Sequence, residues 1–532
     1  MVNWGVTHVF GMVGHSNLGL GDALRLQEEQ GNLQYIGIRH EGAAAFAASG
    51  YAKLCGKPEA CMSIAGPGAT NMLTGLWDAK VDRAPSLALT GQVNTQVLGP
   101  GAFQEIDLAS AFGPVARFSQ TVLRDSNHVE LMNLACKNAL VQRDVAHLIF
   151  PDEVQTIPAA ENAEVGSPAG RTGDQAVAPA PEMVSAAVER IAEASQPAII
   201  VGYGARDSMP AILALAERLH APVLTTFKAK GQLPDTHPLA AGVLGRSGTP
   251  VASWFMNECD RLVVFGASFS NHTGIDKKKP VIQVDFDPMA LGKFHAVELP
   301  VLGEIGVTAS LIQAALPGKI AAQDQRGAVA ERWQIWRDEK ARRRERDRGK
   351  GLHAAVLFDA LSRLIPADAV IAVDVGNNTY SFGRYFECQD QRILMSGYLG
   401  SIGFAFPAAL GAWAATKSQS AFANRKVVSV SGDGGFAQYL AEFNTAVKYG
   451  MNITHVLMNN SELGKISKEQ RGGNWPVWET NLSNPNFAEY ARLCGGLGLR
   501  VKRPDELDAA LAKALAAPGP SLVEVMTDAE LV

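Results

Sequence analysis

The segment KVVSVSGDGG, residues 426–435, decides the fold because it places a glycine-flanked carboxylate directly after an apolar run. A second apolar run, ITHVLM at residues 453–458, is followed at once by Asn459 and Asn460. Short apolar runs bounded by turn residues predict buried strands of a parallel sheet. Since parallel strands end at the same edge of a sheet, we expect Asp433 and Asn460, 27 residues apart, to face one ligand there.

These residue types indicate a magnesium and phosphate site. Mg²⁺ prefers hard oxygen ligands and often shares them between protein and phosphate, and Asp433 and Asn460 supply two such oxygens. The backbone N–H groups of Gly432, Gly434 and Gly435 can approach a diphosphate closely. GDG alone is more typical of an ordinary strand-to-turn connection, so the paired asparagines carry the prediction.

The composition narrows the class of protein. The chain has 532 residues, 47% of them hydrophobic and 19% charged, with 52 glycines, which favours a glycine-punctuated α/β enzyme. A formal net charge of -5 gives no electrostatic reason to bind nucleic acid or an anionic membrane. The six cysteines are scattered, and the sequence contains neither a leader segment nor an apolar run of membrane-spanning length. We therefore expect a cytoplasmic enzyme with small-molecule partners and no membrane anchoring.

The pattern along the chain predicts an α/β fold with three doubly wound parallel-sheet domains. In residues 1–157 apolar runs alternate with alanine-rich helical stretches. Residues 158–181, rich in Pro, Ala and Gly, are typical of a linker. Four expected strands mark a second domain at residues 182–318. Residues 319–351 read as a linker with a charged, solvated helix, and residues 352–532 as the last domain.

Nearly the whole chain, from GVTHVFGMVG (residues 5–14) to SLVEV (residues 521–525), resembles the thiamine diphosphate enzymes that include pyruvate oxidases, acetolactate synthases and 2-oxo acid decarboxylases. The resemblance implies a pyrimidine-binding N-terminal domain and a diphosphate-binding C-terminal domain. It also implies that the backbone carbonyl of Glu462 completes the shell of a bound Mg²⁺.

The same resemblance assigns residues to the cofactor's rings. Glu41 matches the carboxylic acid that is hydrogen-bonded to N1′ of the pyrimidine, although alone it is equally a carboxylate at a helix start. Ile402 matches the apolar wedge that bends the cofactor, although alone it reads as core. The Gly400 carbonyl matches the group that holds the 4′-amino nitrogen. Further implied cofactor contacts are Gly66, Pro67, Gly68 and Asn71 in GPGATN, Gly376, Asn377 and Asn378 in DVGNN, and Gly464.

Within the family the likeness is closest to pyruvate oxidases. Phe103 and Gln104 look like the substrate-side pair, and Glu469 matches a glutamate near the reacting carbon. Lys465 is a departure, because oxidases carry a phenylalanine at this position near both cofactors. A lysine facing the site would bind a second carboxylate and favour carboligation, whereas a lysine facing solvent would contribute its methylene stem alone.

The central domain resembles the FAD-binding domain of oxidases and acetolactate synthases. The implied flavin contacts are Gly204, Arg206, Arg246 and Asp285. GYGAR, residues 202–206, is shorter than a full dinucleotide fingerprint, so an ordinary strand-to-helix turn stays open.

The expected activity is decarboxylation of a 2-oxo acid such as pyruvate, dependent on thiamine diphosphate and Mg²⁺, with oxidation through FAD. The alternatives are an acetolactate synthase-type carboligase and a non-oxidative decarboxylase. A nicotinamide dehydrogenase or a non-catalytic binding protein would leave Asp433, Asn460 and Glu41 unexplained. In this family the Glu41 domain of one subunit faces the diphosphate domain of another, which implies a homodimer at least and favours a homotetramer.

Overall fold

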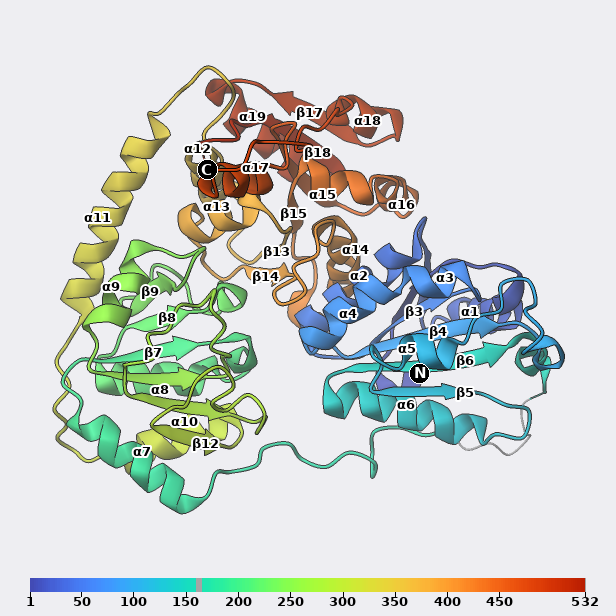
Figure 1. Ribbon diagram of the computed structural model, residues 1–532, viewed down its shortest axis with the longest axis horizontal. Coiled ribbons are helices and arrows are strands. Elements are labelled where there is room, and N and C mark those ends of the chain that lie inside the picture. Colours follow the sequence, from blue (N-terminus) through green and yellow to red (C-terminus); the bar gives the residue numbers. More distant parts are fainter. Residues whose placement is uncertain (159–164, 532) are drawn as a thin grey trace.

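The computed structural model describes residues 1–158 and 165–531. Residues 159–164 of the expected linker and residue 532 of the expected last domain therefore lie outside the described residues. Within the described ranges the strands form three parallel sheets of six strands each, with helices against both faces (Figure 1). This confirms the predicted fold class. No helix in this part of the chain is long and apolar enough to cross a membrane.

The N-terminal sheet has the strand order β2-β1-β3-β4-β6-β5. Its strands β1, β3 and β4 are buried along their whole length, as expected where helices cover both faces of a sheet. The strands are β1 (His8–Gly11), β2 (Gln34–Gly37), β3 (Glu59–Ser63), β4 (Ser86–Gln92), β5 (Phe118–Thr121) and β6 (Val145–Pro151). The helices are α1 (Leu18–Glu29), α2 (Glu41–Cys55), α3 (Pro67–Asn71), α4 (Leu73–Val81), α5 (Leu108–Phe112) and α6 (His128–Gln142).

The C-terminal sheet repeats this order as β14-β13-β15-β16-β18-β17. The strands are β13 (Val370–Val373), β14 (Arg392–Met395), β15 (Val427–Gly432), β16 (Ile453–Asn459), β17 (Leu497–Val501) and β18 (Ser521–Met526). The helices are α12 (Ala354–Leu364), α13 (Asn377–Tyr385), α14 (Ala405–Ser418), α15 (Asp433–Gln438), α16 (Glu442–Lys448), α17 (Gly464–Gly472), α18 (Phe487–Leu493) and α19 (Pro504–Leu515).

The central sheet is ordered β9-β8-β7-β10-β11-β12, the order of dinucleotide-binding folds. Four of its strands match the expected ones, and the sequence pattern missed the two edge strands, β9 and β12. Both edge strands are short and contain Gly242 or Pro300, residues that weaken a strand signal. The elements are α7 (Pro181–Glu193), β7 (Pro197–Val201), α8 (Met209–Leu219), β8 (Val223–Thr225), β9 (Ala240–Val243), α9 (Pro250–Glu258), β10 (Arg261–Phe265), β11 (Val281–Asp285), β12 (Leu299–Leu302) and α10 (Ile305–Ala315).

The strand orders locate the crevices where ligands bind. In a doubly wound sheet the crevice opens where the order reverses, outside the carboxyl ends of the strands. In the C-terminal sheet that point lies between β13 and β15, so the loops after residues 373 and 432 border it. In the N-terminal sheet it lies between β1 and β3, beside the loop that leads into α3.

The N- and C-terminal domains share one hydrophobic core through α2 and α14. Small residues bring the two helix backbones together. A Cβ on Gly50 would lie 2.6 Å from the carbonyl oxygen of Ala408, and a Cβ on Gly411 would overlap the carbonyl oxygen of Ala47. Both glycines are therefore required by the close approach.

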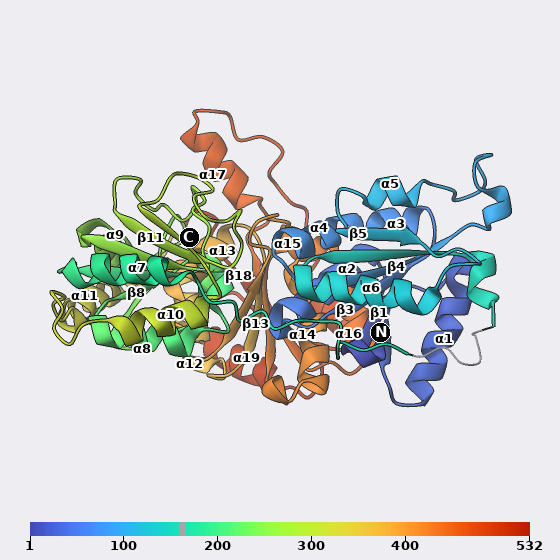
Figure 2. The ribbon, with the colours of Figure 1, turned by 90° about the horizontal axis from the view of Figure 1, so that it is seen from below.

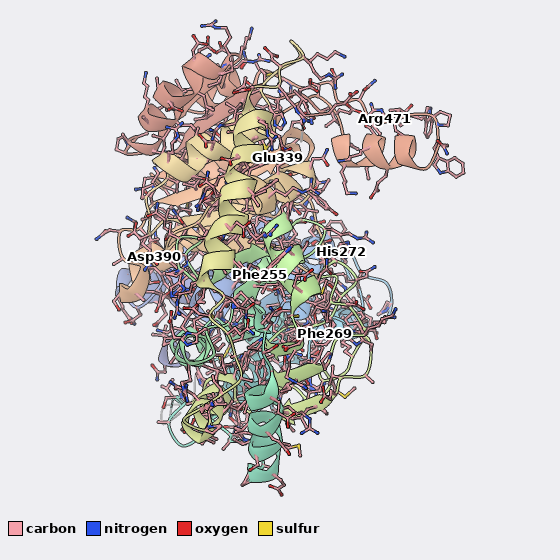
Figure 3. The ribbon with its side chains drawn as sticks, turned by 90° about the vertical axis from the view of Figure 1, so that its left-hand side faces the viewer. Phe255, Phe269, His272, Glu339, Asp390 and Arg471 are labelled. Atoms are coloured by element: carbon pink, nitrogen blue, oxygen red, sulfur yellow. The ribbon has the colours of Figure 1, made fainter. Side chains whose placement is uncertain are left out.

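The expected charged helix is α11 (Arg326–Arg344), and it is more than a solvated spacer. Figure 3 shows this helix, which carries Glu339, lying against the central domain near Phe255. Its own residues Val329, Trp333 and Trp336 are buried, and Trp333 Nε1 donates to the Ala240 carbonyl at 2.7 Å. Most charged side chains of α11 face outward, Lys340 is buried against Glu387, and the aromatic side chains join the hydrophobic core.

Candidate active site

Asp433 begins α15 directly after β15, and its carboxylate is buried. Its Oδ2 accepts from the Ser461 N–H at 2.8 Å and from Asn484 Nδ2 at 2.7 Å. Burial raises the pKa of the Asp433 carboxyl above its ordinary value. A cation beside the carboxylate would offset this cost of charge burial.

The turn at residues 459–462, called the asparagine loop below, lies against Asp433, as expected for two parallel strands that end at the same edge of the sheet. The side chain of Asn459 is fixed by a hydrogen bond, since its Nδ2 donates to buried Glu524 at 2.7 Å. Asn460 Oδ1 accepts from the Glu462 N–H at 3.0 Å. The Ser461 carbonyl accepts from the Leu482 N–H at 2.8 Å, which fixes the course of the backbone at Glu462. Asn460 and Glu462 therefore stand on one braced turn, and the Ser461 N–H of this turn donates to Asp433.

The second loop, residues 374–378, meets the asparagine loop at Gly464. A Cβ on Gly464 would lie 2.9 Å from Asn377 Nδ2 and 3.3 Å from Asn460 Nδ2. Asn377 Nδ2 is buried and has no hydrogen-bond partner among the described residues. On the other side, Asn378 Oδ1 lies 2.9 Å from the Cβ position of Gly376 and 3.7 Å from that of Gly432.

These loops fit a diphosphate with a divalent cation. Backbone left open by glycines, the Asn377 amide donor without a partner among the described residues, and the Asp433 carboxylate against the turn of Asn460 form a suitable donor set for phosphate and Mg²⁺. Asp433, Asn460 and the Glu462 carbonyl would hold the cation. Gly376, Asn377, Asn378, Gly432, Gly434, Gly435 and Gly464 would surround the diphosphate.

Asp374 lies at the centre of this crevice. Its carboxylate accepts from the Gly403 N–H at 2.9 and 3.1 Å, and a Cβ on Gly435 would overlap it. Burial raises the pKa of this carboxyl to about 7. Asp374 thus joins the segment that carries Ile402 to the glycines that follow Asp433.

Glu41 is the first residue of α2 and is buried. Its Oε2 accepts from Asn71 Nδ2 at 3.0 Å, and its Oε1 lies 2.9 Å from the Cβ position of Gly68. The GPGATN motif therefore surrounds the Glu41 carboxyl. Pro67 is the first residue of α3, and Gly66 has a φ of +65°, a conformation that favours glycine.

Phe103 and Gln104 lie on the loop before α5, close to GPGATN. A Cβ on Gly66 would lie 2.9 Å from Gln104 Cβ. Gln104 has a φ of +64°, and its Oε1 is buried without a hydrogen-bond partner among the described residues. Phe103, in contrast, is 81% exposed. The structure places Gln104 beside the motif around Glu41 and leaves the Phe103 ring on the surface of the single chain.

Gly400 and Ile402 lie on the segment between β14 and α14. Gly400 has a φ of +70°, and a Cβ there would meet no atom within 4 Å. The positive φ, which glycine adopts more readily than other residues, accounts for a glycine at this position, and close contacts do not. Ile402 is half-buried and is followed by Gly403, which Asp374 holds.

Lys465 and Glu469 pair with each other one turn apart on α17. Lys465 Nζ also lies 5.1 Å from the centre of the Tyr380 ring. Lys465, and to a smaller extent Arg246, hold the pKa of the Glu469 carboxyl below its ordinary value. The ammonium of Lys465 is therefore engaged by a carboxylate of its own helix.

The four residues proposed for flavin binding follow three strands of the central sheet: Gly204 and Arg206 follow β7, Arg246 follows β9, and Asp285 ends β11. A Cβ on Gly204 would lie 3.0 Å from Gly266 Cα, so backbone packing already requires this glycine. The Arg206 guanidinium lies 4.5 Å from the Tyr203 ring and near the end of α2. Asp285 is buried at the end of β11, and the Arg246 N–H donates to the His272 carbonyl at 3.0 Å. Figure 3 shows His272 and Phe269 on this side of the domain.

Two residues that the sequence pattern did not single out support the site. Asn484 bridges Asp433 and Asn459, to whose Oδ1 it donates at 3.1 Å. Glu442 on α16 accepts from the N–H groups of Arg39 and His40 at 3.0 and 2.9 Å, which fixes the turn before Glu41. Asn484 precedes a proline and gives a turn signal, whereas Glu442 gives no signal in an ordinary helical pattern.

A doubly wound sheet whose crevice combines a buried carboxylate, paired asparagines and a glycine-lined cradle defines a diphosphate-binding α/β enzyme. The chain matches three domain families: "Thiamine pyrophosphate enzyme, N-terminal TPP binding domain" over residues 1–111, the central domain over residues 184–312 and the "C-terminal TPP binding domain" over residues 374–525. The chain therefore belongs to the thiamine pyrophosphate enzymes, and it uses thiamine diphosphate.

Named relatives extend over almost the whole chain. A putative thiamine pyrophosphate-containing protein, YdaP, of Bacillus subtilis is 35% identical over 98% of this chain and 89% of its own length. The probable acetolactate synthase large subunit of Methanocaldococcus jannaschii is 32% identical over 98% of this chain and 90% of its own length. The acetolactate synthase isozyme 2 large subunit of Escherichia coli is 31% identical, with 98% and 93% covered.

Proposed function

We propose that this enzyme decarboxylates a 2-oxo acid, pyruvate in the simplest case, and joins the remaining two-carbon unit to a second 2-oxo acid. The product from two pyruvates would be acetolactate. The observation that carries the proposal is the similarity to acetolactate synthases over 98% of the chain. These relatives favour the carboligase over the pyruvate oxidase that the sequence motifs placed first.

The proposed roles divide between the two ends of the cofactor. When bound, thiamine diphosphate supplies the carbon nucleophile that adds to the substrate carbonyl and accepts the charge left by loss of carbon dioxide. Asp433, Asn460 and the Glu462 carbonyl hold Mg²⁺ against the diphosphate. Glu41 keeps a proton at N1′ of the pyrimidine. Ile402 would pack against the cofactor's rings, and the Gly400 carbonyl would accept from its 4′-amino group.

On the substrate side, Gln104 is the best-placed polar group. Its Oε1 is buried without a hydrogen-bond partner among the described residues, and we assign its Nε2, a donor, to the carboxylate of a 2-oxo acid. Lys465 pairs with Glu469 at the proposed acceptor side. A second substrate carboxylate that displaces Glu469 would gain the Lys465 ammonium, a step that a phenylalanine at this position does not offer.

We also propose that Mg²⁺ and FAD are bound and that FAD is not reduced during turnover. The order of the central sheet, that of dinucleotide-binding folds, supports a flavin in its crevice. Arg246 and Asp285 are the side chains proposed to contact it, with Gly204 and Arg206 beside them.

The deciding experiment mixes the enzyme anaerobically with thiamine diphosphate, Mg²⁺, FAD and pyruvate, and then measures acetolactate, carbon dioxide and flavin absorbance. A carboligase releases one carbon dioxide for each acetolactate formed and leaves the flavin yellow. Acetate with a bleached flavin would establish the oxidase instead. Free acetaldehyde with unbleached flavin would establish simple decarboxylation.

A further inference from the structure

The segment at residues 396–403, which carries Gly400 and Ile402, has no regular secondary structure of its own. It leaves β14 at Met395 and enters α14 at Ala405. A segment of this kind keeps its shape through contacts at its ends. At its end, Asp374 of the same domain accepts from the Gly403 N–H. At its start, the contact comes from another domain.

Asp82, just after α4 in the N-terminal domain, provides that contact. Its Oδ2 accepts from the Gly397 N–H at 3.0 Å. The same oxygen lies 2.8 Å from Lys53 Nζ on α2, and Lys53 Nζ donates to the Met395 carbonyl at 2.9 Å. The carboxylate and its lysine therefore hold the backbone on both sides of residue 396.

The central domain completes the cluster through Lys228 in the turn at Phe227–Ala229. Lys228 Nζ donates to Asp82 Oδ1 at 2.7 Å, and its stem lies against Gly397, where a Cβ would overlap it. Burial opposes ionisation of Asp82, but Lys228 and Lys53 outweigh it and hold the pKa of this carboxyl below its ordinary value. The charged Asp82 thus connects all three domains at one fully buried point.

We propose that Asp82 is a positioning residue for the cofactor. Through Gly397 it fixes, from the N-terminal domain, the segment by which the C-terminal domain bends and orients the pyrimidine. The proposal rests on the assignment of Gly400 and Ile402 to the cofactor, and it is independent of whether the product is acetolactate or acetate.

Asp78 offers a matched control. It is as buried as Asp82 and binds the same lysine, with Lys53 Nζ 2.7 Å from its Oδ2, but its other partner is Ser49. Asp78→Ala and Asp82→Ala each remove one buried carboxylate from Lys53, so both are expected to lower the melting temperature. Asp82→Ala alone releases Gly397.

The test has two readouts. Hydrogen exchange of the protein without cofactor follows the peptide that covers residues 396–403, and tryptophan fluorescence gives the Kd for thiamine diphosphate at saturating Mg²⁺. Loss of one hydrogen bond to a charged group predicts about tenfold faster exchange and about tenfold weaker binding in Asp82→Ala. Asp78→Ala should stay within about twofold of the parent in both.

Equal changes in the two variants would overturn the proposal, because they would show that the cluster contributes to stability alone. Unchanged exchange in Asp82→Ala would overturn it as well. Should either alanine variant fail to fold, Asp82→Leu and Asp78→Leu allow the same comparison, because leucine fills a similar space but offers no acceptor to the Gly397 N–H or to Lys53.

Discussion

At the scale of the residue, Asp433 is both buried and surrounded by donors that favour its charged form, two features that oppose each other when no ligand is bound. Its carboxylate is buried, which costs free energy when it is charged, yet Ser461 and Asn484 donate to it as to an anion. A bound cation reconciles burial with charge. The diphosphate end of the site therefore depends on this side chain most directly.

Asp433→Ala is expected to abolish Mg²⁺-dependent binding of thiamine diphosphate, because it removes a metal ligand and leaves the diphosphate poorly compensated. Titration of the cofactor with and without Mg²⁺ measures this. Asn484→Ala, which keeps the carboxylate and removes its brace, should weaken binding to a smaller extent. Normal Mg²⁺-dependent affinity in Asp433→Ala would contradict the assignment of the metal site.

Glu41 presents its carboxyl between Asn71 and the glycines of GPGATN. Glu41→Gln keeps the shape and an acceptor for Asn71 but lacks the acidic proton. Exchange of the cofactor's C2 proton should slow by about a hundredfold or more, the usual scale for a general acid or base. NMR of acid-quenched samples measures the rate, and cofactor affinity serves as the control. An unchanged rate would contradict the catalytic assignment and leave Glu41 with the role of a carboxylate at the start of a helix.

The sequence predicts the site residues that directly follow strands, but it does not predict the residues that hold those site residues in place. Asp433 and Asn460 stand directly after apolar runs, so their meeting follows from the parallel sheet alone. Glu442 and Asp82 lie in ordinary helical surroundings, and their partners, His40 and Gly397, are far away along the chain. No local pattern indicates such contacts, since they depend on how complete domains pack.

At the scale of the element, the pairing of α2 with α14 controls how the two cofactor-binding domains meet. Glu41 begins α2, while α14 follows the segment of Ile402. Their glycines allow backbone contact, so helix spacing sets how the two domains of one chain lie relative to each other. The alanine-rich pattern predicted helical stretches in this domain but not the partner of α2, because small residues give no signal of what they pack against.

Gly411→Ala is expected to destabilise the protein by about 1–3 kcal/mol, since its Cβ would overlap the Ala47 carbonyl and force the helices apart. Gly327→Ala, in α11, is the matched control because a Cβ there meets no atom within 4 Å. Alanine has the higher helix propensity, so this control should be neutral or slightly stabilising. Thermal unfolding compares the two, and equal effects would contradict the argument from close packing.

At the scale of the whole molecule, large apolar side chains remain on the surface of the single chain. Phe103 is 81% exposed, and Trp475 and Trp478, which follow α17, are 71% and 72% exposed. Figure 2 shows α17 projecting away from the body of the molecule. Exposed aromatic side chains of this kind are typical of surfaces that bind a protein partner.

We therefore expect at least a homodimer in which these surfaces are covered. Sedimentation should show a dimer or tetramer, and activity should fall on dilution as the assembly dissociates. Trp475→Ser combined with Trp478→Ser should shift the equilibrium towards monomer by tenfold or more, since buried aromatic anchors dominate many interfaces. A fully active monomer at every concentration would contradict both the assembly and a site shared between subunits.

The shared core of α2 and α14 also has a consequence during synthesis of the chain. Nearly every residue of α2 is buried, and much of its cover is α14, which leaves the ribosome about 360 residues later. At ordinary translation rates that interval is roughly 20 to 70 seconds, during which the face of α2 that α14 later covers stays exposed on the N-terminal domain. The nascent protein is thus most prone to aggregation while the central domain is being made, and a ribosome stalled there would hold its most vulnerable folding intermediate.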